Sequence, residues 1–140
     1  KENFNYILTN YPNTDFALDA QFKLDLIIEV LASKEMYIAR HYMKKQKWIP
    51  AINRFKKVVD DYDTTIYVEE ALFRLVEIYY RIGLSEEAKK YAKLLGYNYQ
   101  SSRWYKESYR IFNKNYESPI EKIQKEKKNF IIRKFKSIFN

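Results

Sequence analysis

Apolar residues recur along the chain at helical spacing, and the intervals between these runs carry residues that end helices. From Asp15 to Gln46 there is no Gly and no Pro, and apolar residues stand three, four or seven positions apart. This stretch predicts one continuous helix of about 48 Å, at about 1.5 Å per residue. Similar runs predict further helices over residues 1–10, 49–61, 67–82, 85–95 and 103–115. No stretch has a strand pattern, so the sequence predicts an all-α fold.

The glycines and prolines fall at the predicted helix boundaries. Gly83 and Gly96 each follow an apolar run, where a helix often ends on a residue that tolerates left-handed dihedral angles. Pro50 and Pro119 stand just inside helix starts, where the missing N–H has no intrahelical partner to lose. Ser85 is expected to cap the N-terminus of its helix, because its hydroxyl can accept from an early amide.

An aromatic, small, bulky order of residues occurs twice, 37 positions apart. The first copy consists of Tyr42, Ala51 and Phe55. The second consists of Tyr79, Ala88 and Ala92. A fixed offset of this size predicts units of two antiparallel helices that bury each other's apolar faces. The order resembles the tetratricopeptide pattern, although the motif is degenerate and the period slightly long. We therefore expect a tetratricopeptide-like helix-turn-helix solenoid in which the long helix is shared between two units.

Composition and charge narrow the classes of function. The 140 residues, 46% of them hydrophobic, suit a single domain with a substantial core. The chain has no cysteine, which excludes disulfides, thiolate metal sites and cysteine nucleophiles within it. Of the net charge of +8, residues 118–140 contribute +5 (seven Lys/Arg, two Glu), which leaves +3 for the first 117. Because the basic character belongs mainly to the tail, no nucleic-acid partner is expected.

The same change in charge divides the chain into residues 1–117, the repeats, and residues 118–140, a basic amphipathic helix or tail. The apolar positions of the tail are Ile120, Ile123, Phe130, Ile131, Phe135 and Ile138. This pattern fits a helix that lies on an anionic membrane surface or docks on a partner, and fits equally a helix that caps the solenoid. We expect capping over Pro119–Gln124 and leave Phe130 onward open.

Two sets of residues are candidates for binding a partner protein. On the helix over 49–61, Asn53, Arg54 and Lys57 lie off the apolar stripe, and the planar guanidinium of Arg54 can bind a carboxylate through two hydrogen bonds. A solvated basic face is the alternative interpretation. The second set follows the first helices of two units, which line the concave groove of such arrays: Met36, Arg40, Met43, Lys44, Phe73, Glu77, Tyr80 and Arg81. This mixture suits a peptide or a partner helix unless later helices cover the groove.

Nothing in the sequence indicates catalysis. His41 is the single histidine, and a general base needs partners that no pattern supplies. The acidic residues of the pairs at 60–61 and 69–70 are adjacent, so their side chains diverge around the helix axis and neither pair suggests a metal site. We therefore expect neither an enzyme nor a bound cofactor or metal.

Several short runs of the repeats resemble those of one protein family. These runs are Lys34-Glu35-Met36, Ala39-Arg40-His41-Tyr42, Ala51-Ile52-Asn53-Arg54-Phe55, Val68-Glu69-Glu70-Ala71-Leu72, Arg74-Leu75-Val76-Glu77, Gly83-Leu84, Glu87-Ala88, Leu95-Gly96 and Trp104-Tyr105. Together with residues 11–25 they resemble, in order and spacing over about residues 1–112, the BamD family. Its members are tetratricopeptide lipoproteins of the bacterial outer-membrane β-barrel assembly (BAM) machinery.

The resemblance implies a non-catalytic scaffold on the periplasmic face of the outer membrane. Mature members of that family begin with a lipidated cysteine and continue through a series of repeats. This chain, which opens on Lys1 inside a helical pattern, would be a piece that supplies about the last three repeats and lacks that cysteine. The resemblance also implies docking on the POTRA domains of BamA, with Arg54 at the contact. Other BAM lipoproteins and unfolded outer-membrane proteins are further candidate partners.

Two other functions stay open from the residues alone. One is a cytoplasmic tetratricopeptide adaptor that binds a different peptide. The other, a weaker one, is a module that binds a membrane surface or a nucleic acid through the basic tail.

Overall fold

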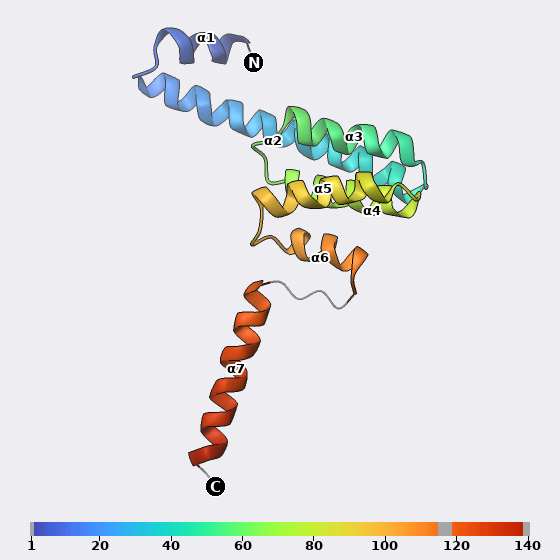
Figure 1. Ribbon diagram of the computed structural model, residues 1–140. Helices are drawn as coiled ribbons and strands as arrows, with labels where there is room; N and C mark the ends of the chain where they lie inside the picture. The colour runs from blue at the N-terminus through green and yellow to red at the C-terminus, as the bar shows by residue number, and fades with distance from the viewer. Residues whose placement is uncertain (1, 115–118, 139–140) are drawn as a thin grey trace.

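The computed structural model describes residues 2–114 and 119–138, and within these ranges every regular element is an α-helix. In chain order the helices are α1 (Glu2–Asn10), α2 (Asp15–Lys44), α3 (Trp48–Asp61), α4 (Val68–Arg81), α5 (Ser85–Asn98), α6 (Arg103–Phe112) and α7 (Pro119–Ile138). Helices α2 to α6 stack side by side with short connections, and α7 points away from the stack (Figure 1). The expected all-α fold is confirmed.

The long helix α2 belongs to two helical pairs at once. Its 30 residues run without interruption, and Thr14 caps its start by accepting a hydrogen bond from the amide of Ala17 at 3.2 Å. The first half of α2 lies beside α1 and the second half beside α3 (Figure 1). The predicted shared helix is therefore confirmed, although it ends at Lys44, two residues earlier than expected.

The ends of α2 and α4 are built in the same way. The residue that follows each helix cap has a positive φ, 56° at Gln46 and 86° at Gly83. In both turns the next amide donates to the carbonyl of the repeat tyrosine: Lys47 to Tyr42 at 2.9 Å, and Leu84 to Tyr79 at 2.8 Å. These are the hydrogen bonds of a Schellman motif. Because the paired residues stand 37 positions apart, the repeat includes the backbone of the turn.

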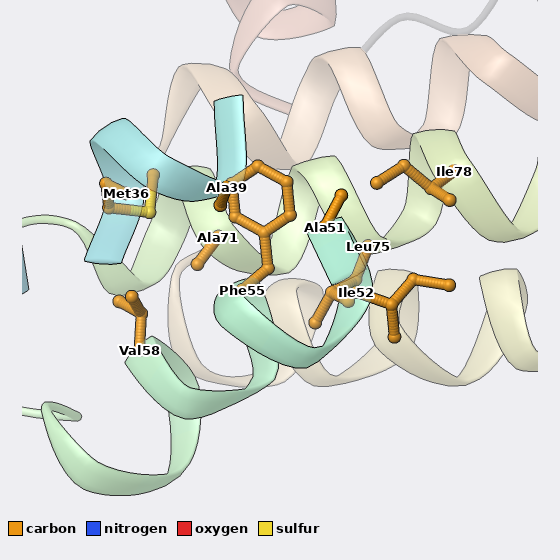
Figure 2. Packing of buried hydrophobic residues seen from close by; sticks show 9 residues of the cluster. All are labelled: Met36, Ala39, Ala51, Ile52, Phe55, Val58, Ala71, Leu75 and Ile78. Carbon is orange, nitrogen blue, oxygen red and sulfur yellow. The ribbon is translucent and has the colours of Figure 1, made fainter. Parts of the chain in front are cut away.

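The main core lies where α2, α3 and α4 meet. Its nine buried residues, which Figure 2 shows converging from these helices, are Met36, Ala39, Ala51, Ile52, Phe55, Val58, Ala71, Leu75 and Ile78. Ala51 and Ala88, the alanines at the small position of the repeat, are fully buried, as expected of residues that let helices approach closely. Tyr42 and Tyr79 are half-buried and pack against this core, so the predicted role of the repeat residues in packing is confirmed.

The start and the end of α5 differ from the prediction. Ser85 is the first helical residue, and the cap position belongs to Leu84, which makes no side-chain capping bond. The reason is that the tight turn at Gly83 leads directly into the helix. Gly96 lies inside α5 rather than after it. It serves a close approach of α6, because a Cβ at Gly96 would stand 2.7 Å from Cε2 of Tyr105.

Helix α7 is joined to α6 by charged groups. Glu121 lies 3.3 Å from both Lys106 and Arg110 of α6. Ile123 is 53% exposed, so the expectation that residues 119–124 cap the solenoid is wrong for this residue. Helix α6 ends at Phe112, three residues before the predicted end. The predicted helix end at 115 and the predicted boundary between 117 and 118 lie outside the described residues, as do the side chains of Ile120, Lys136 and Ile138.

Candidate partner-binding surfaces

Arg54 is held on α3 by a carboxylate from α2. Its Nη1 donates to Oε2 of Glu35 at 2.9 Å, and Nζ of Lys57 lies 3.7 Å from Oε1 of the same side chain. The Glu35 side chain is only 12% exposed, whereas those of both cations are about two-fifths exposed. The nearly buried carboxylate of Glu35 therefore orients the accessible cations of Arg54 and Lys57. The three side chains together carry a net charge of +1.

A shallow depression of about 350 Å³ adjoins these cations. It is lined by Tyr42, Ile49, Pro50, Asn53, Arg54 and Lys57. The three candidate residues of α3 are thus brought together, as the helical spacing predicted. Sequence reasoning missed the part played by Glu35, because no local pattern links it to Arg54 and Lys57, which stand 19 and 22 positions away. The exposed Ile49 gives the depression an apolar side, so a partner could bury apolar surface while it supplies an acceptor to the cations.

A second surface is organised by charges that cross from α2 to α4. Arg40 donates to both oxygens of Glu70, at 3.0 and 2.6 Å, and Nε of Arg74 donates to Glu70 at 3.3 Å. Further along α4, Nη1 of Arg74 lies 2.9 Å and Nη2 of Arg81 3.7 Å from Glu77. Three arginines are thereby held in fixed positions by two carboxylates. Long cationic side chains that are already ordered lose less conformational entropy when they bind a ligand.

The protonation states of this network favour the charged forms. Burial by itself would raise the pKa of Glu70, but the hydrogen bond and charge of Arg40, together with Arg74, outweigh it and hold that pKa below its ordinary value. The same hydrogen bond from Glu70 raises the pKa of Arg40 against the opposing effect of burial. The pair is therefore fully ionised at neutral pH.

A groove of about 600 Å³ lies beside this network. It is lined by Tyr37, Arg40, His41, Met43, Lys44, Gln46, Arg74 and Arg81. Four of these residues are Lys or Arg and none is Asp or Glu, so the lining carries an excess of positive charge. Tyr37 is 73% exposed and offers a large aromatic contact area next to these cations.

Part of the predicted groove is present as a cavity, and its binding of a partner stays a prediction. Arg40, Met43, Lys44 and Arg81 line it as expected. Met36 does not, because it lies three residues before Ala39 on the face of α2 that packs against α3 and α4, where it is fully buried. The expectation that Met36 contacts a partner is therefore wrong.

The remaining predicted groove residues have partners within the chain. The ring of Phe73 lies 5.0 Å from that of Trp104, and the ring of Tyr80 lies 5.4 Å from that of Phe112. Both contacts come from α6, which covers this end of the predicted surface, although Tyr80 stays exposed at its edge. Glu77 acts by holding arginines rather than by lining the groove.

Sequence reasoning missed Tyr37 and Arg74 as residues of the groove. Two signals could have found them. Tyr37 stands outside the apolar stripe of α2 although it is aromatic, and Arg74 follows Glu70 at the spacing of a helical ion pair.

Within the described ranges, no cluster of three or more His, Cys, Asp or Glu side chains could hold a metal ion. His41 is exposed, and its ring lies 6.1 Å from that of Tyr42 in an edge-on contact. In the same part of the chain, no helix has both the length and the apolar character that a bilayer crossing requires.

Comparison with protein families decides where the chain belongs. The model of the YfiO family, described as outer membrane lipoprotein, matches residues 1–94, about two thirds of the chain. The chain is a member of the YfiO family. The YfiO match ends within α5, so α6 and α7 lie beyond it.

Curated relatives of this YfiO-family chain are named outer membrane protein assembly factor BamD. A relative from Rickettsia prowazekii is 50% identical over 118 residues, which are 84% of this chain and 47% of the relative. One from Caulobacter vibrioides is 49% identical over 109 residues, 78% of this chain and 36% of the relative. One from Neisseria meningitidis serogroup A is 33% identical over 99 residues, which are 71% of this chain and 37% of the relative. The resemblance to BamD is confirmed, and the chain spans less than half the length of these relatives.

Proposed function

We propose that this chain is part of a non-catalytic scaffold for the assembly of outer-membrane β-barrel proteins. The observation that carries the proposal is the 50% identity, over 84% of the chain, to a relative named as an assembly factor. A stack of helices with two preorganised cationic surfaces supports it, because such surfaces bind other proteins without chemistry of their own. The proposed location is the periplasmic face of the outer membrane, where a lipidated cysteine of the longer protein anchors it.

The surface around Arg54 is the proposed docking site for the POTRA domains of BamA. The hydrogen bond to Glu35 uses one of the five donors of the guanidinium, so its fork can also bind a carboxylate of the partner. Lys57 shares the charge of Glu35 and so reduces the repulsion that a second carboxylate would meet. The depression beside it supplies the apolar contact that a specific interface requires.

The groove between α2 and α4 is the proposed site for a second class of partner. Other BAM lipoproteins and unfolded outer-membrane proteins are the candidates. An extended segment with acidic and aromatic side chains would match the cations and Tyr37 of the groove. Because the two surfaces use different residues, a substitution in one should leave binding at the other unchanged.

The test of the docking site is a titration of purified POTRA domains into the chain and its Arg54→Glu variant. Reversal of a charge that is paired across an interface should weaken binding by at least about tenfold. Lys89→Glu is the matched control, because Lys89 is a half-exposed cation on α5 and should leave affinity unchanged. Circular dichroism checks that both variants remain helical.

Two further variants separate the contact from its support. Arg54→Gln removes the charge without placing a second carboxylate beside Glu35, and should also weaken binding. Glu35→Gln keeps Arg54 but removes the bond that orients it, and should weaken binding less than the loss of Arg54 does. If folded Arg54→Glu binds POTRA domains as tightly as the original chain, Arg54 is not at the contact.

A further inference from the structure

Helix α7 exposes an apolar surface that no other helix covers within the part of the chain that the structure describes. Among its described residues, the exposed apolar side chains are Ile123, Phe130, Ile131, Ile132 and Phe135. Phe130 and Phe135 are 65% and 62% exposed. The helix projects from the stack for about 30 Å, at about 1.5 Å per residue, and joins α6 through the ion pairs of Glu121 (Figure 1). It also lies beyond the part of the chain that the YfiO family matches.

The charge of α7 is strongly positive and is arranged around the apolar side chains. Residues 119–138 contain seven Lys/Arg and two Glu, a net charge of +5. At 100° per residue, Lys125 and Ile132 fall on the side opposite Ile123 and Phe130. Lys122 and Arg133 fall on one flank of the apolar side chains, Lys128 falls on the other flank, and Lys127 falls among them. Lys134 falls on the apolar side, but its Nζ lies 6.0 Å from the ring centroid of Phe130. Its aliphatic stem can therefore lie along apolar surface while the ammonium reaches a polar boundary.

We propose that α7 binds the surface of an anionic phospholipid bilayer and lies parallel to its plane. Phe130, Ile131 and Phe135 would enter the boundary between headgroups and acyl chains, and the surrounding Lys and Arg side chains would contact lipid phosphates. A basic helix of 20 residues with exposed aromatic and branched aliphatic side chains has the composition of such interfacial helices.

Two other occupants fit α7 less well. A second copy of the chain would bring two helices of charge +5 together along their apolar sides, and their repulsion opposes pairing. An acidic groove on a protein would neutralise cations on one side of the helix. In α7 most cations lie on both flanks of the apolar side and within it, an arrangement that a plane of phosphate groups beside the helix can neutralise.

Bilayer binding by α7 would add a second attachment to a family described as outer membrane lipoproteins. Two weak attachments on one molecule bind far more tightly than either alone, because the second event is intramolecular. The proposal does not depend on the assembly function proposed above. Vesicle binding and POTRA binding are separate measurements on different residues, so either can fail alone.

The test is cosedimentation of the full chain with vesicles of phosphatidylglycerol and phosphatidylcholine, compared with vesicles of phosphatidylcholine alone. Binding is expected to the anionic vesicles only and should weaken as salt is added. The variant Phe130→Ser/Ile131→Ser/Phe135→Ser keeps every charge and should lose more than about tenfold in affinity. The variant Lys125→Gln/Lys128→Gln/Arg133→Gln keeps the apolar side and should lose about a hundredfold, at about fivefold per cation.

Matched controls on other helices keep the test specific to α7. Phe16→Ser/Leu18→Ser/Phe22→Ser removes equally exposed apolar side chains from α2, and Lys89→Gln/Lys90→Gln/Lys93→Gln removes exposed cations from α5. Both controls should bind anionic vesicles within about threefold of the original chain, and circular dichroism should show all variants helical. The lysine control is needed because the chain has a net charge of +8 and could bind anionic lipid without using α7.

Three results would overturn the proposal. The first is absence of binding to anionic vesicles. The second is binding that the serine variant of α7 leaves unchanged, which would mean that charge alone attracts the chain. The third is self-association that the serine variant abolishes while vesicles have no effect, which would assign the apolar side of α7 to a second copy.

Discussion

Gln46 holds a backbone conformation that glycine holds at the equivalent position of the next repeat. Its φ is 56°, and that of Gly83, 37 residues later, is 86°. In a residue with a side chain this left-handed conformation crowds Cβ against the following carbonyl, at a cost of about 1–2 kcal/mol. The substitution Gln46→Gly removes that cost and leaves the turn intact, since its hydrogen bonds join backbone groups such as the Lys47 amide and the Tyr42 carbonyl.

The expected gain is smaller than the strain. Glycine makes the unfolded chain more flexible, which offsets about 0.5–1 kcal/mol of the relief. Gln46→Gly should therefore raise the free energy of unfolding by about 0.5–1 kcal/mol and the melting temperature by about 1–4 °C. Gly83→Ala should do the reverse by a similar amount. A Cβ at Gly83 would have no heavy atom within 4 Å outside residues 82–84, so the loss would come from the backbone and not from a clash.

Urea unfolding followed by circular dichroism measures both effects. The denaturation midpoint should rise for Gln46→Gly and fall for Gly83→Ala, without a change in the slope. Gln21→Gly is the control, because Gln21 is exposed within α2 and glycine there should cost about 1 kcal/mol. The reasoning is refuted if Gln46→Gly destabilises the chain, or if Gly83→Ala leaves the midpoint where it was.

Two other predictions concern the core and the network between α2 and α4. Phe55→Ala should lower the free energy of unfolding by about 3–5 kcal/mol, because the fully buried ring lies where three helices meet (Figure 2). A loss below about 1 kcal/mol in the same urea assay would contradict this. Because the folded pKa of Glu70 is lowered, its ion pair with Arg40 should stabilise the fold above the unfolded pKa of about 4.3 and be lost as the pH falls through the folded value. Glu70→Gln should thus reduce stability at neutral pH and flatten its decline in acid, and a parallel decline in both proteins would count against this.

The sequence by itself determined the helices and the repeat. Helical spacing is a local property, so an uninterrupted apolar pattern from Asp15 was enough to predict that α2 is one helix. The 37-residue offset predicted which residues pack between helices. Ala51 and Ala88 occupy the small position of the repeat and Phe55 occupies the bulky position, and all three are buried. The family also followed from short runs within these repeats, as the comparisons confirmed.

Only the tertiary structure decided which side chains are covered and which charges meet. Met36 and Tyr37 are neighbours in sequence, yet the first is buried and the second lines the groove, because α3 and α4 cover one side of α2. The pair of Arg54 with Glu35 joins two helices across 19 residues, and Gly96 is needed because α6 crosses α5 there. Periodicity indicates which side of a helix is apolar. Which neighbour covers that side, and at what distance, depends on helix crossings that no local pattern encodes.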